Sequence, residues 1–417
     1  MSVVIVGGGP AGMMAAIAAA SRGRKVVLIE KNDRPGRKMY ISGKGRCNIT
    51  NNTDIKSFLN EVVSNPKFLM AALYAFPPSA AMEFFESNGL PLKTERGDRV
   101  FPASDKSADV IDLMRNLLKE KGVKLVASET VKRLEKVGET ITKVVTDKSE
   151  YPCEAVLLAT GGISYPKTGS TGDGYLFAKE LGHTIIEPKP ALCPVLLKGA
   201  YDTAGKLIGY NELPFPQGLS LKNVEAKIIK KDNSPLYKEF GEMLFTDKGV
   251  SGPCVLSLSS RINRAVFSDI MFSIDLKPAL DEKTLDARIL RDFGEAPNRQ
   301  FKNSLSELLP KSLIPYIVAL SGIDPDKPIN AISKAERKGL LGLLKNLRFS
   351  IEGLEGFDQA IVTAGGVSVK EVNPSTMASK LVKNLYFAGE ILDVDALTGG
   401  YNIQIALSTG YLAGKNI

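Results

Sequence analysis

The sequence predicts an α/β protein in which one nucleotide-binding domain is interrupted by a long insert. Three observations favour this architecture. A strand–glycine turn–helix–strand pattern begins at residue 2, a proline-punctuated β-rich stretch and then a helical stretch occupy the middle of the chain, and strand and helix patterns return near its end. We therefore expect residues 1–190 and 350–417 to form one domain and residues 191–349 to form the insert.

The composition is that of a folded protein, and it excludes several classes of function. Of the 417 residues, 44% are hydrophobic and 24% are charged, which supplies enough apolar side chains for a core. The chain has 54 Lys and Arg residues against 46 Asp and Glu residues, and the net charge of +8 suits an anionic ligand. The single histidine, His183, excludes multi-histidine metal sites, so no metal is expected.

Cysteine usage and hydropathy predict a cytoplasmic protein. The four cysteines form no C-x-x-C pair, and so few thiols in a long chain are typical of a reducing compartment. No run of 18 apolar residues is free of Gly, Pro and charge, so neither a membrane span nor a membrane partner is expected. Residues 3–20 are apolar but lack a basic start and contain a glycine–proline break, so we interpret them as the start of the fold.

The N-terminal elements form a βαβ unit. Residues 3–6 are a short apolar run, as in a buried parallel strand, and residues 13–21 are almost entirely Ala, Met and Ile, which favours a helix. Residues 25–30 form the second strand. Residues 31–53 are rich in Gly and basic side chains without a helical or strand period, and this pattern predicts a long ordered loop.

The later elements follow from the same patterns. Apolar spacing predicts an amphipathic helix over residues 105–121 and a β-meander over residues 123–158. The remaining expectations are an antiparallel sheet or small barrel over residues 191–276, helices over residues 280–347, strands over residues 359–369 and 384–388, and a helix over residues 403–412.

A glycine motif follows the first strand. Gly7, Gly9 and Gly12 give G-x-G-x-x-G, which provides a tight turn, close backbone approach to a pyrophosphate, and close packing of helix on strand. Glu30 ends the second strand, where a carboxylate accepts hydrogen bonds from ribose hydroxyls and repels a 2′-phosphate. The ligand expected here is therefore FAD or NAD, and not NADP.

Two C-terminal segments favour FAD. Residues 385–390 are a strand leading into Gly389 and Glu390, and flavoproteins of the glutathione-reductase type place such an acid on the ribitol of FAD. Residues 398–404 form a glycine turn that opens the last helix, where backbone N–H groups can meet the N1/O2 edge of the flavin. The predicted fold is a glutathione-reductase-type, Rossmann-like FAD-binding domain with an inserted β-barrel and a small helical domain.

The basic loop of residues 37–51 is the most distinctive stretch of the chain. Four cations lie within ten residues and alternate with Gly, Cys, Asn and Thr, which favours a clamp on the diphosphate and the flavin edge over a solvated basic loop. A second glycine-rich stretch, residues 168–174, lacks the Lys-[ST] ending of a P-loop. It is either a turn beside the cofactor or a scaffold turn.

With these motifs, the chain resembles a bacterial flavoprotein family with an inserted β-barrel and helical domain. That family is labelled aminoacetone-oxidase-like or NAD(P)/FAD-dependent oxidoreductase, and it includes 3-dehydro-bile-acid reductases. The resemblance implies FAD, a three-part architecture and redox chemistry. Many relatives carry a histidine within the segment 244–249, whereas this chain has Asp247, so a role for that histidine does not transfer. The matching segments span the chain: residues 4–12, 37–51, 99–102, 159–166, 168–174, 244–253, 363–366 and 387–402.

The residues expected to contact the cofactor come from the motifs and from the resemblance together. The resemblance implies FAD contacts from ten of them, among them Lys38, Gly45, Asn48 and Asn402. The full expected set is Gly7, Gly9, Pro10, Ala11, Gly12, Glu30, Lys31, Arg37, Lys38, Ser42, Gly43, Gly45, Arg46, Cys47, Asn48, Thr160, Gly161, Gly389, Glu390, Gly400, Tyr401, Asn402 and Ile403.

The catalytic residue is not identified by any motif. Tyr401, Arg99 and Tyr165 are candidates for a proton donor or an oxyanion partner at the flavin, and the sequence does not rank them. For Cys47 a small buried thiol is favoured over a reactive one, because no resolving cysteine stands at C-x-x-C spacing. His183 is expected to be structural.

The expected function is FAD-dependent oxidoreduction of a small organic substrate by hydride transfer at flavin N5, with the substrate between flavin and insert. One option is reduction of an enone-type C=C bond, as in a 3-oxo-4-ene steroid or bile acid. A second is oxidation of a small amine or aminoketone. The chain has no second G-x-G-x-x-G unit, so NAD(P)H is expected only as a transient electron donor.

A different class of function, a flavin-dependent nucleic-acid modifier or binder, is prompted by the net charge of +8. No aromatic–basic interleaving typical of a single-strand platform is apparent, so no nucleic-acid partner is expected. No oligomeric state is predicted.

Overall fold

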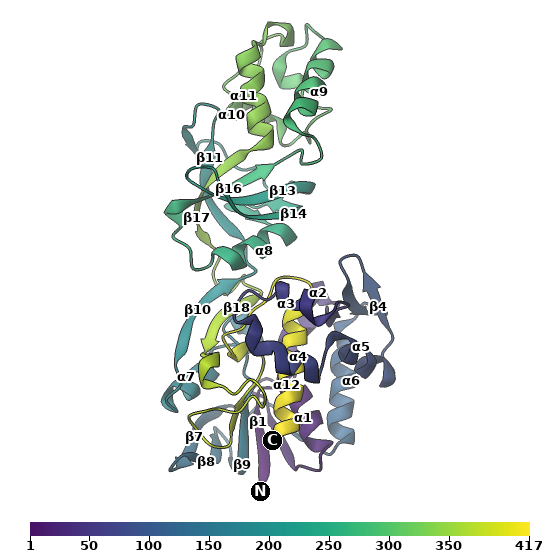
Figure 1. Cartoon of the computed structure of the whole chain (residues 1–417), viewed down its shortest axis with the longest axis vertical. Coiled ribbons are helices and arrows are strands. Elements are labelled where there is room, and N and C mark those ends of the chain that lie inside the picture. Colours follow the sequence, from purple (N-terminus) through teal and green to yellow (C-terminus); the bar gives the residue numbers. More distant parts are fainter. The chain divides into compact units, whose positions relative to one another are not determined.

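The computed structural model describes all 417 residues and divides them into two compact units (Figure 1). Unit 1 comprises Met1–Ala191 and Phe357–Ile417, and unit 2 comprises Leu192–Gly356. Each unit has its own cluster of buried hydrophobic side chains. The chain returns to unit 1 later than residue 350, because strand β17 (Leu347–Leu354) pairs with other strands of unit 2.

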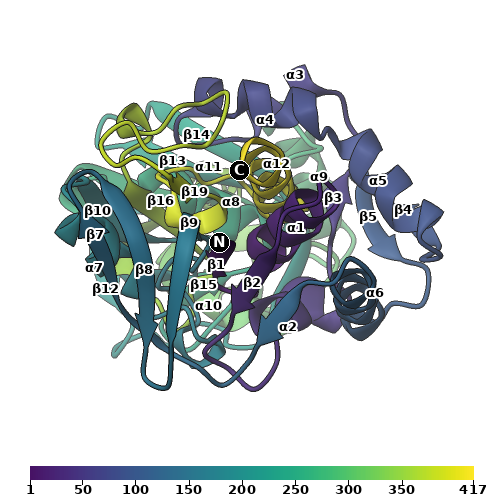
Figure 2. The same cartoon turned by 90° about the horizontal axis from the view of Figure 1, so that it is seen from below.

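Unit 1 contains a predominantly parallel sheet, and the predicted βαβ start is confirmed. Strand β1 runs parallel to both β2 and β9, with its apolar side chains buried. Figure 2 shows β7, β8, β9, β1 and β2 side by side. The parallel strands are, in order, β6 (Lys124–Val126), β2 (Val26–Ile29), β1 (Ser2–Val6), β9 (Glu150–Leu158) and β19 (Leu385–Phe387).

The predicted meander is also present. Strands β7 (Val131–Val137) and β8 (Thr140–Thr146) are antiparallel, and β8 pairs in turn with the first part of β9. The predicted amphipathic helix is α6 (Ser107–Glu120), which buries Val110, Met114 and Leu118.

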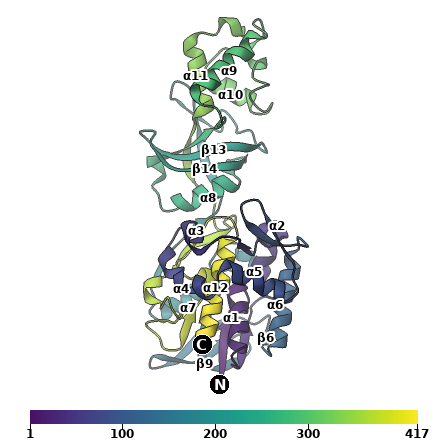
Figure 3. The same cartoon turned by 45° about the vertical axis from the view of Figure 1, so that its right-hand side comes forward.

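The first and last helices of the chain pack against each other. Helix α1 (Pro10–Ala20) and helix α12 (Tyr401–Asn416) lie side by side in Figures 1 and 3. The contact is close because glycine faces backbone: a Cβ on Gly410 would lie 2.3 Å from the carbonyl oxygen of Ala11. The C-terminal helix is therefore fitted directly onto the N-terminal glycine motif.

The ordered loop predicted for residues 31–53 is only partly correct. Residues Arg37–Gly45 form helix α2, which is interrupted at Ser42, Gly43 and Lys44 by non-helical backbone angles. Strand β3 (Thr50–Asn51) then pairs with β5 (Arg99–Pro102). The interruption explains why no helical period is visible in the sequence.

A helical segment covers part of unit 1 and also passes a membrane-span test by length and composition. This segment, Pro66–Ser87, has a mean hydropathy of 1.3. In the structure it is divided into a 3₁₀ turn and two helices, α4 (Met70–Ala75) and α5 (Pro78–Ser87), and it buries Phe68 and Phe85 in the core of unit 1. Such a core helix is ordinary in a soluble fold, so the segment is weak evidence for a membrane span.

The smaller elements of unit 1 complete it. Strand β10 pairs antiparallel with β18, so that Ala191 lies opposite Val362. These elements are α3 (Ile55–Asn60), β4 (Leu92–Glu95), α7 (Asp173–Glu180), β10 (Ile185–Ala191) and β18 (Val362–Val367).

Unit 2 is a closed barrel with helices, as predicted. Pairing of β11 with β17 closes the ring of strands β11, β15, β14, β13, β16 and β17, and β12 extends β11. Figure 3 shows α9, α10 and α11 grouped together within this unit. The bounds are β11 (Val195–Tyr201), β12 (Leu207–Gly209), β13 (Ser220–Lys230), β14 (Pro235–Phe245), β15 (Gly249–Ser251), α8 (Pro253–Ile262), β16 (Ile270–Asp275), α9 (Glu282–Gly294), α10 (Ile314–Ser321) and α11 (Lys334–Lys345).

Unit 1 without unit 2 is expected to fold and to bind FAD. The change is a fusion of Ala191 to Phe357 through a short Gly/Ser linker, which the antiparallel pairing of β10 with β18 allows. The reason is that the hydrophobic core and the cavity described below use residues of unit 1 alone. The measurement is the ratio of flavin to protein after purification, with the full chain as control. A cooperatively unfolding fusion that takes up no FAD would show that unit 2 contributes to the cofactor site.

Candidate functional site

A cavity of about 440 Å³ opens at the carboxyl ends of β1 and β2 and at the N-terminus of α1. This is the position at which open α/β sheets bind ligands. All of its lining residues belong to unit 1. Of the residues expected to contact the cofactor, those that line it are Gly7, Gly9, Pro10, Ala11, Glu30, Lys31, Arg37, Lys38, Ser42, Gly43, Thr160, Gly161, Gly389, Glu390, Asn402 and Ile403.

The glycine turn has the geometry that a diphosphate cradle requires. Gly7 has a φ of +105°, and a Cβ there would lie 2.4 Å from the carbonyl oxygen of Ala159. A Cβ on Gly9, by contrast, would meet no atom within 4 Å, so this backbone faces open space. The first turn of α1 leaves backbone N–H groups without intrahelical partners, and these N–H groups favour an anion.

Glu30 is buried and held in one orientation. Its Oε2 accepts a hydrogen bond from the backbone N–H of Gly8 at 2.8 Å, and its Oε1 accepts two from Asn32, at 2.8 Å from the backbone nitrogen and 2.7 Å from Nδ2. An ionised carboxylate has about four acceptor positions. Room therefore remains for ribose hydroxyls at a fixed carboxylate.

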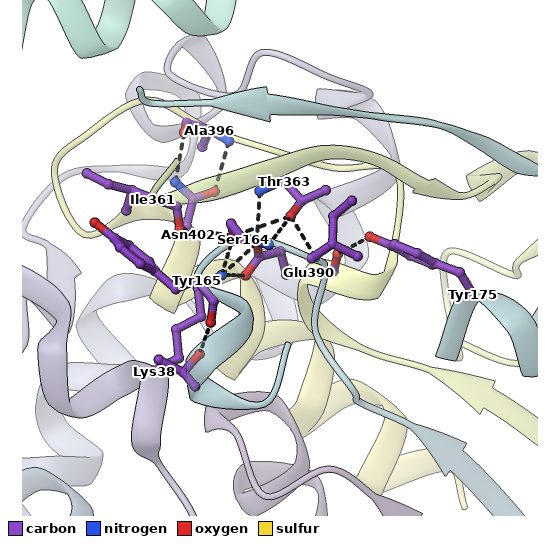
Figure 4. A network of polar contacts seen from close by, with 11 residues as sticks. Lys38, Ser164, Tyr165, Tyr175, Ile361, Thr363, Glu390, Ala396 and Asn402 are labelled. Carbon is purple, nitrogen blue, oxygen red and sulfur yellow. Dashed lines mark hydrogen bonds and ion pairs between the residues drawn. The ribbon is translucent and has the colours of Figure 1, made fainter. Parts of the chain in front are cut away.

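Besides the glycine turn and Glu30, the cavity is lined by Glu390, which lies in a network of polar contacts (Figure 4). Lys38 Nζ lies 2.6 Å from Oε2 and 2.8 Å from Oε1 of Glu390. Oε1 also accepts from Ser164 Oγ at 3.0 Å and from the backbone N–H of Thr363 at 2.9 Å. Segments that are far apart in sequence thus meet at one carboxylate, and Lys38 of α2 is fixed there by an ion pair.

Asn402 shapes the turn that opens α12. Its Oδ1 accepts from the backbone N–H of Ala396 at 3.0 Å, and its Nδ2 donates to the Ala396 carbonyl oxygen at 2.7 Å. A Cβ on the neighbouring Gly400 would lie 2.3 Å from the carbonyl oxygen of Thr50. The Oδ1 of Asn48 lies beside this glycine and is buried without a hydrogen-bond partner, but Asn48 does not line the cavity. The open space at Gly9 and the acceptor positions left on Glu30 are the features that fit FAD.

Seven residues of the expected set lie outside the cavity lining: Gly12, Gly45, Arg46, Cys47, Asn48, Gly400 and Tyr401. Gly12 packs under the turn, because a Cβ there would lie 1.9 Å from the carbonyl oxygen of Gly7. The Arg46 guanidinium lies 2.8 Å from Glu95 and stacks over the Phe101 ring. Gly12 therefore supports the glycine turn, and Arg46 supports the end of α2.

Cys47 and His183 are buried within the fold of unit 1 and do not line the cavity. Burial raises the pKa of the Cys47 thiol to about 12, so it is a neutral thiol at physiological pH. Burial also lowers the pKa of His183, although its Nδ1 lies 3.3 Å from Glu371. Its Nε2 lies 2.8 Å from Ser379 Oγ, and the ring packs edge-on against Phe387.

The three candidates for a catalytic group are placed differently. Tyr165 lines the cavity, whereas Tyr401 and Arg99 do not. The Tyr401 ring packs edge-on against Phe58, and burial raises its pKa to about 12. The Nε of Arg99 donates to the carbonyl oxygen of Arg96 at 3.0 Å.

Strand β14 of unit 2 carries exposed aromatic side chains, with Lys238 lying 3.7 Å from Glu225 and Arg261 lying 4.0 Å from Glu239. Tyr237, Lys238 and Phe240 are all exposed, Phe240 with 58% of its surface. The Arg261 guanidinium lies 5.7 Å from the centroid of the Tyr237 ring. This part of β14 does not follow the usual barrel pattern in which every second side chain is buried, because residues 235–238 are all exposed.

Comparisons with known proteins agree with this geometry. The family model described as HI0933-like protein Rossmann domain matches residues 1–416. The chain is 32% identical over 416 residues to the 3-dehydro-bile acid delta(4,6)-reductase of Clostridium scindens, covering 99% of this chain and 97% of that protein. It is 30% identical over 415 residues to the ribosomal RNA dihydrouridine synthase of Escherichia coli, covering 99% and 97%.

Solved structures share the fold. The 3-ketosteroid-Δ4-(5α)-dehydrogenase of Rhodococcus jostii RHA1, solved with 4-androstene-3,17-dione, superposes with a TM-score of 0.52 at 14% identity. The match covers 100% of this chain and 95% of that chain. At this identity the likeness concerns the fold alone.

Proposed function

Because the chain belongs to the HI0933-like family and is an FAD-dependent oxidoreductase, we propose that it reduces a C=C bond conjugated to a carbonyl group. One structural observation carries this proposal: no carboxylate that lines the cavity is free to act as a base. Glu30 and Glu390 accept the hydrogen bonds described above, Asp173 pairs with Lys31 at 2.7 Å, and Glu129 accepts from Thr146 and Tyr151. At neutral pH an amine is protonated and must give a proton to an acceptor before its oxidation, whereas reduction of an activated alkene needs a hydride and an acid.

FAD, when bound, supplies the hydride chemistry at its N5 position. The residues of this chain bind and orient it. The Gly7–Gly9 turn would hold the diphosphate, Glu30 the adenosine ribose, and Glu390 with Lys38 the ribitol and ring portion. A nicotinamide dinucleotide is the proposed transient electron donor. The proposed location is the cytoplasm, because four free cysteines are typical of a reducing compartment.

The proposed substrate is a small 3-oxo-4-ene compound of the steroid or bile-acid kind. The relative named as a delta(4,6)-reductase of 3-dehydro-bile acids supports this class, because its name describes saturation of C=C bonds conjugated to a 3-oxo group. Dihydrouridine is uridine with its C5=C6 bond saturated, and that bond is also conjugated to a carbonyl group. The two kinds of relative therefore point to one reaction type.

A second candidate substrate is a uracil base of ribosomal RNA. Two observations favour it: the relative named ribosomal RNA dihydrouridine synthase, and the exposed surface of Tyr237, Lys238 and Phe240 on β14. Exposed aromatic rings can stack on the bases of a single strand. Retention of the protein on ribosomal RNA that falls steeply with salt would favour this candidate.

The reduced enzyme is expected to transfer electrons to an activated alkene faster than to oxygen. The purified holoenzyme is reduced anaerobically by NADH, NADPH or dithionite and mixed in a stopped-flow instrument with a 3-oxo-4-ene steroid, with uridine-containing ribosomal RNA, or with air-saturated buffer. Recovery of the oxidised flavin spectrum gives each rate, and a saturated ketosteroid is the matched inert control. Rapid reoxidation by oxygen with peroxide release, and no response to either alkene, would instead indicate an oxidase.

A further inference from the structure

Tyr165 has a backbone conformation that a bulky residue rarely adopts. Its φ is +50° and its ψ is 60°, in the left-handed region that favours glycine. The conformation is fixed by neighbours: its N–H donates to the Phe357 carbonyl oxygen at 3.0 Å, and its own carbonyl oxygen accepts from Thr168 N at 2.8 Å and Thr168 Oγ1 at 2.7 Å. Eleven non-glycine residues of the chain have a positive φ, and Tyr165 and Lys44 are the two of them that line the cavity.

The side chain of Tyr165 is available to a substrate. It lines the cavity, is half-buried, and its hydroxyl makes no hydrogen bond within the protein. In Figure 4 its ring extends away from the Glu390 carboxylate, while Lys38 and Ser164 are held at that carboxylate. Because the hydroxyl of Tyr165 is carried by a rigid ring at the cavity wall, it is suited to donate a proton in a fixed direction.

The other ionisable proton donors of the cavity are engaged or solvated, and the hydroxyl of Thr160, which has no partner, is a much weaker acid than a phenol. Lys38 is paired with Glu390, and Lys31 with Asp173. The hydroxyl of Ser42 donates to the Met39 carbonyl oxygen. Lys44 also lines the cavity and has no ion-pair partner, but it is exposed, so its ammonium group is solvated on a flexible stem.

We propose that Tyr165 is the catalytic acid that protonates the substrate carbon next to the carbonyl group, a role that rests on the proposed reduction. The substrate β-carbon receives a hydride, with its two electrons, from FAD that a nicotinamide or dithionite has reduced beforehand. The π electrons of the C=C bond move toward the carbonyl oxygen and give an enolate. The α-carbon of this enolate then takes the proton from Tyr165 Oη, and the phenolate regains a proton from water.

The first test is Tyr165→Phe, which removes the hydroxyl and keeps the ring. We expect kcat for alkene reduction to fall by roughly 10²–10⁴-fold, the usual contribution of a general acid, with a smaller change in KM. FAD content and the rate of flavin reduction by dithionite should stay at wild-type values. The matched control is Tyr74→Phe, because Tyr74 is 67% exposed on α4 and lies outside the cavity.

A second readout does not depend on activity. In the cofactor-free protein, Tyr165→Gly should unfold at a higher temperature than Tyr165→Ala, because glycine relaxes the left-handed backbone and alanine does not. Both variants lack the aromatic ring, so the difference isolates the strain. Equal unfolding temperatures would remove the argument that the tyrosine is kept at a conformational cost.

The outcomes separate this inference from the proposed function. A wild type that reduces an alkene and a Tyr165→Phe variant that does so equally fast would overturn the role of Tyr165 alone. The same holds if Lys44→Met or Tyr401→Phe loses alkene reduction while Tyr165→Phe keeps it. A wild type that reacts only with oxygen would overturn the proposed reduction, and the role of Tyr165 with it.

Discussion

Alanine at position 12 is expected to destabilise unit 1 severely. The added methyl carbon would lie 1.9 Å from the carbonyl oxygen of Gly7, and backbone cannot move aside as a flexible side chain can. We expect a loss of about 3 kcal/mol, the upper end for an overpacked site. For a domain of this size that is a fall in melting temperature of roughly 6–12 °C. Thermal unfolding of the cofactor-free protein, followed by circular dichroism, measures it.

Gly9→Ala is the matched control for this substitution within the same motif. A Cβ at Gly9 meets nothing within 4 Å in the protein, so the cofactor-free variant should melt close to wild type. Because Gly9 lines the cavity, its methyl group would occupy space that the diphosphate needs. FAD affinity should fall by about tenfold or more, which corresponds to ~1.4 kcal/mol. The prediction is wrong if the two variants lose stability equally.

Removal of the Glu30 carboxylate should weaken FAD binding by roughly 1–3 kcal/mol, the cost of losing charge-assisted hydrogen bonds. Glu30→Ala would leave the Gly8 N–H without its partner and would remove the acceptor for the adenosine ribose. Titration of the cofactor-free protein with FAD, followed by flavin fluorescence, gives the change in Kd.

FMN provides the internal control for Glu30, since it lacks the adenosine ribose. Any affinity for FMN should be similar in wild type and Glu30→Ala. Glu30→Gln should fall between the two for FAD, because the amide retains one acceptor oxygen. An equal loss for FMN and FAD would mean that Glu30 acts only by holding the Gly8 turn and Asn32 in place.

The fold was largely predictable because its elements are marked by strong local patterns. The apolar run of β1, the glycine turn and the Ala-rich helix α1 each point to the same βαβ unit. Helix α2 was missed because Ser42–Lys44 interrupts it, which leaves too few regular turns to show a period. The insert ends later than residue 349 because β17, in which apolar residues alternate with Arg348, Ser350 and Glu352, pairs with β11 and β16 of unit 2, and only this pairing assigns it there.

The candidate site was predictable at the level of backbone and less so at the level of side chains. Glycines and the strand-end acid Glu30 have positions fixed by main-chain geometry, and they do line the cavity. Tyr401 follows a glycine turn and was expected at the cofactor, yet its ring turns toward Phe58. Tyr165 and Tyr401 are both preceded by short polar or glycine segments, and sequence spacing does not specify which ring faces the cavity.

The packing of α12 on α1 has a consequence for how the protein is made. Glu390 and Asn402, which line the cavity, and Gly410, which seats α12 on the first helix, all belong to the last part of the chain. The glycine motif of α1, in contrast, leaves the ribosome before unit 2 does. During synthesis the phosphate cradle must therefore wait for unit 2 and α12 before the cavity is complete. A chain that stops before Tyr401 lacks α12 and Asn402, so cofactor loading itself distinguishes molecules that have α12 from those that do not.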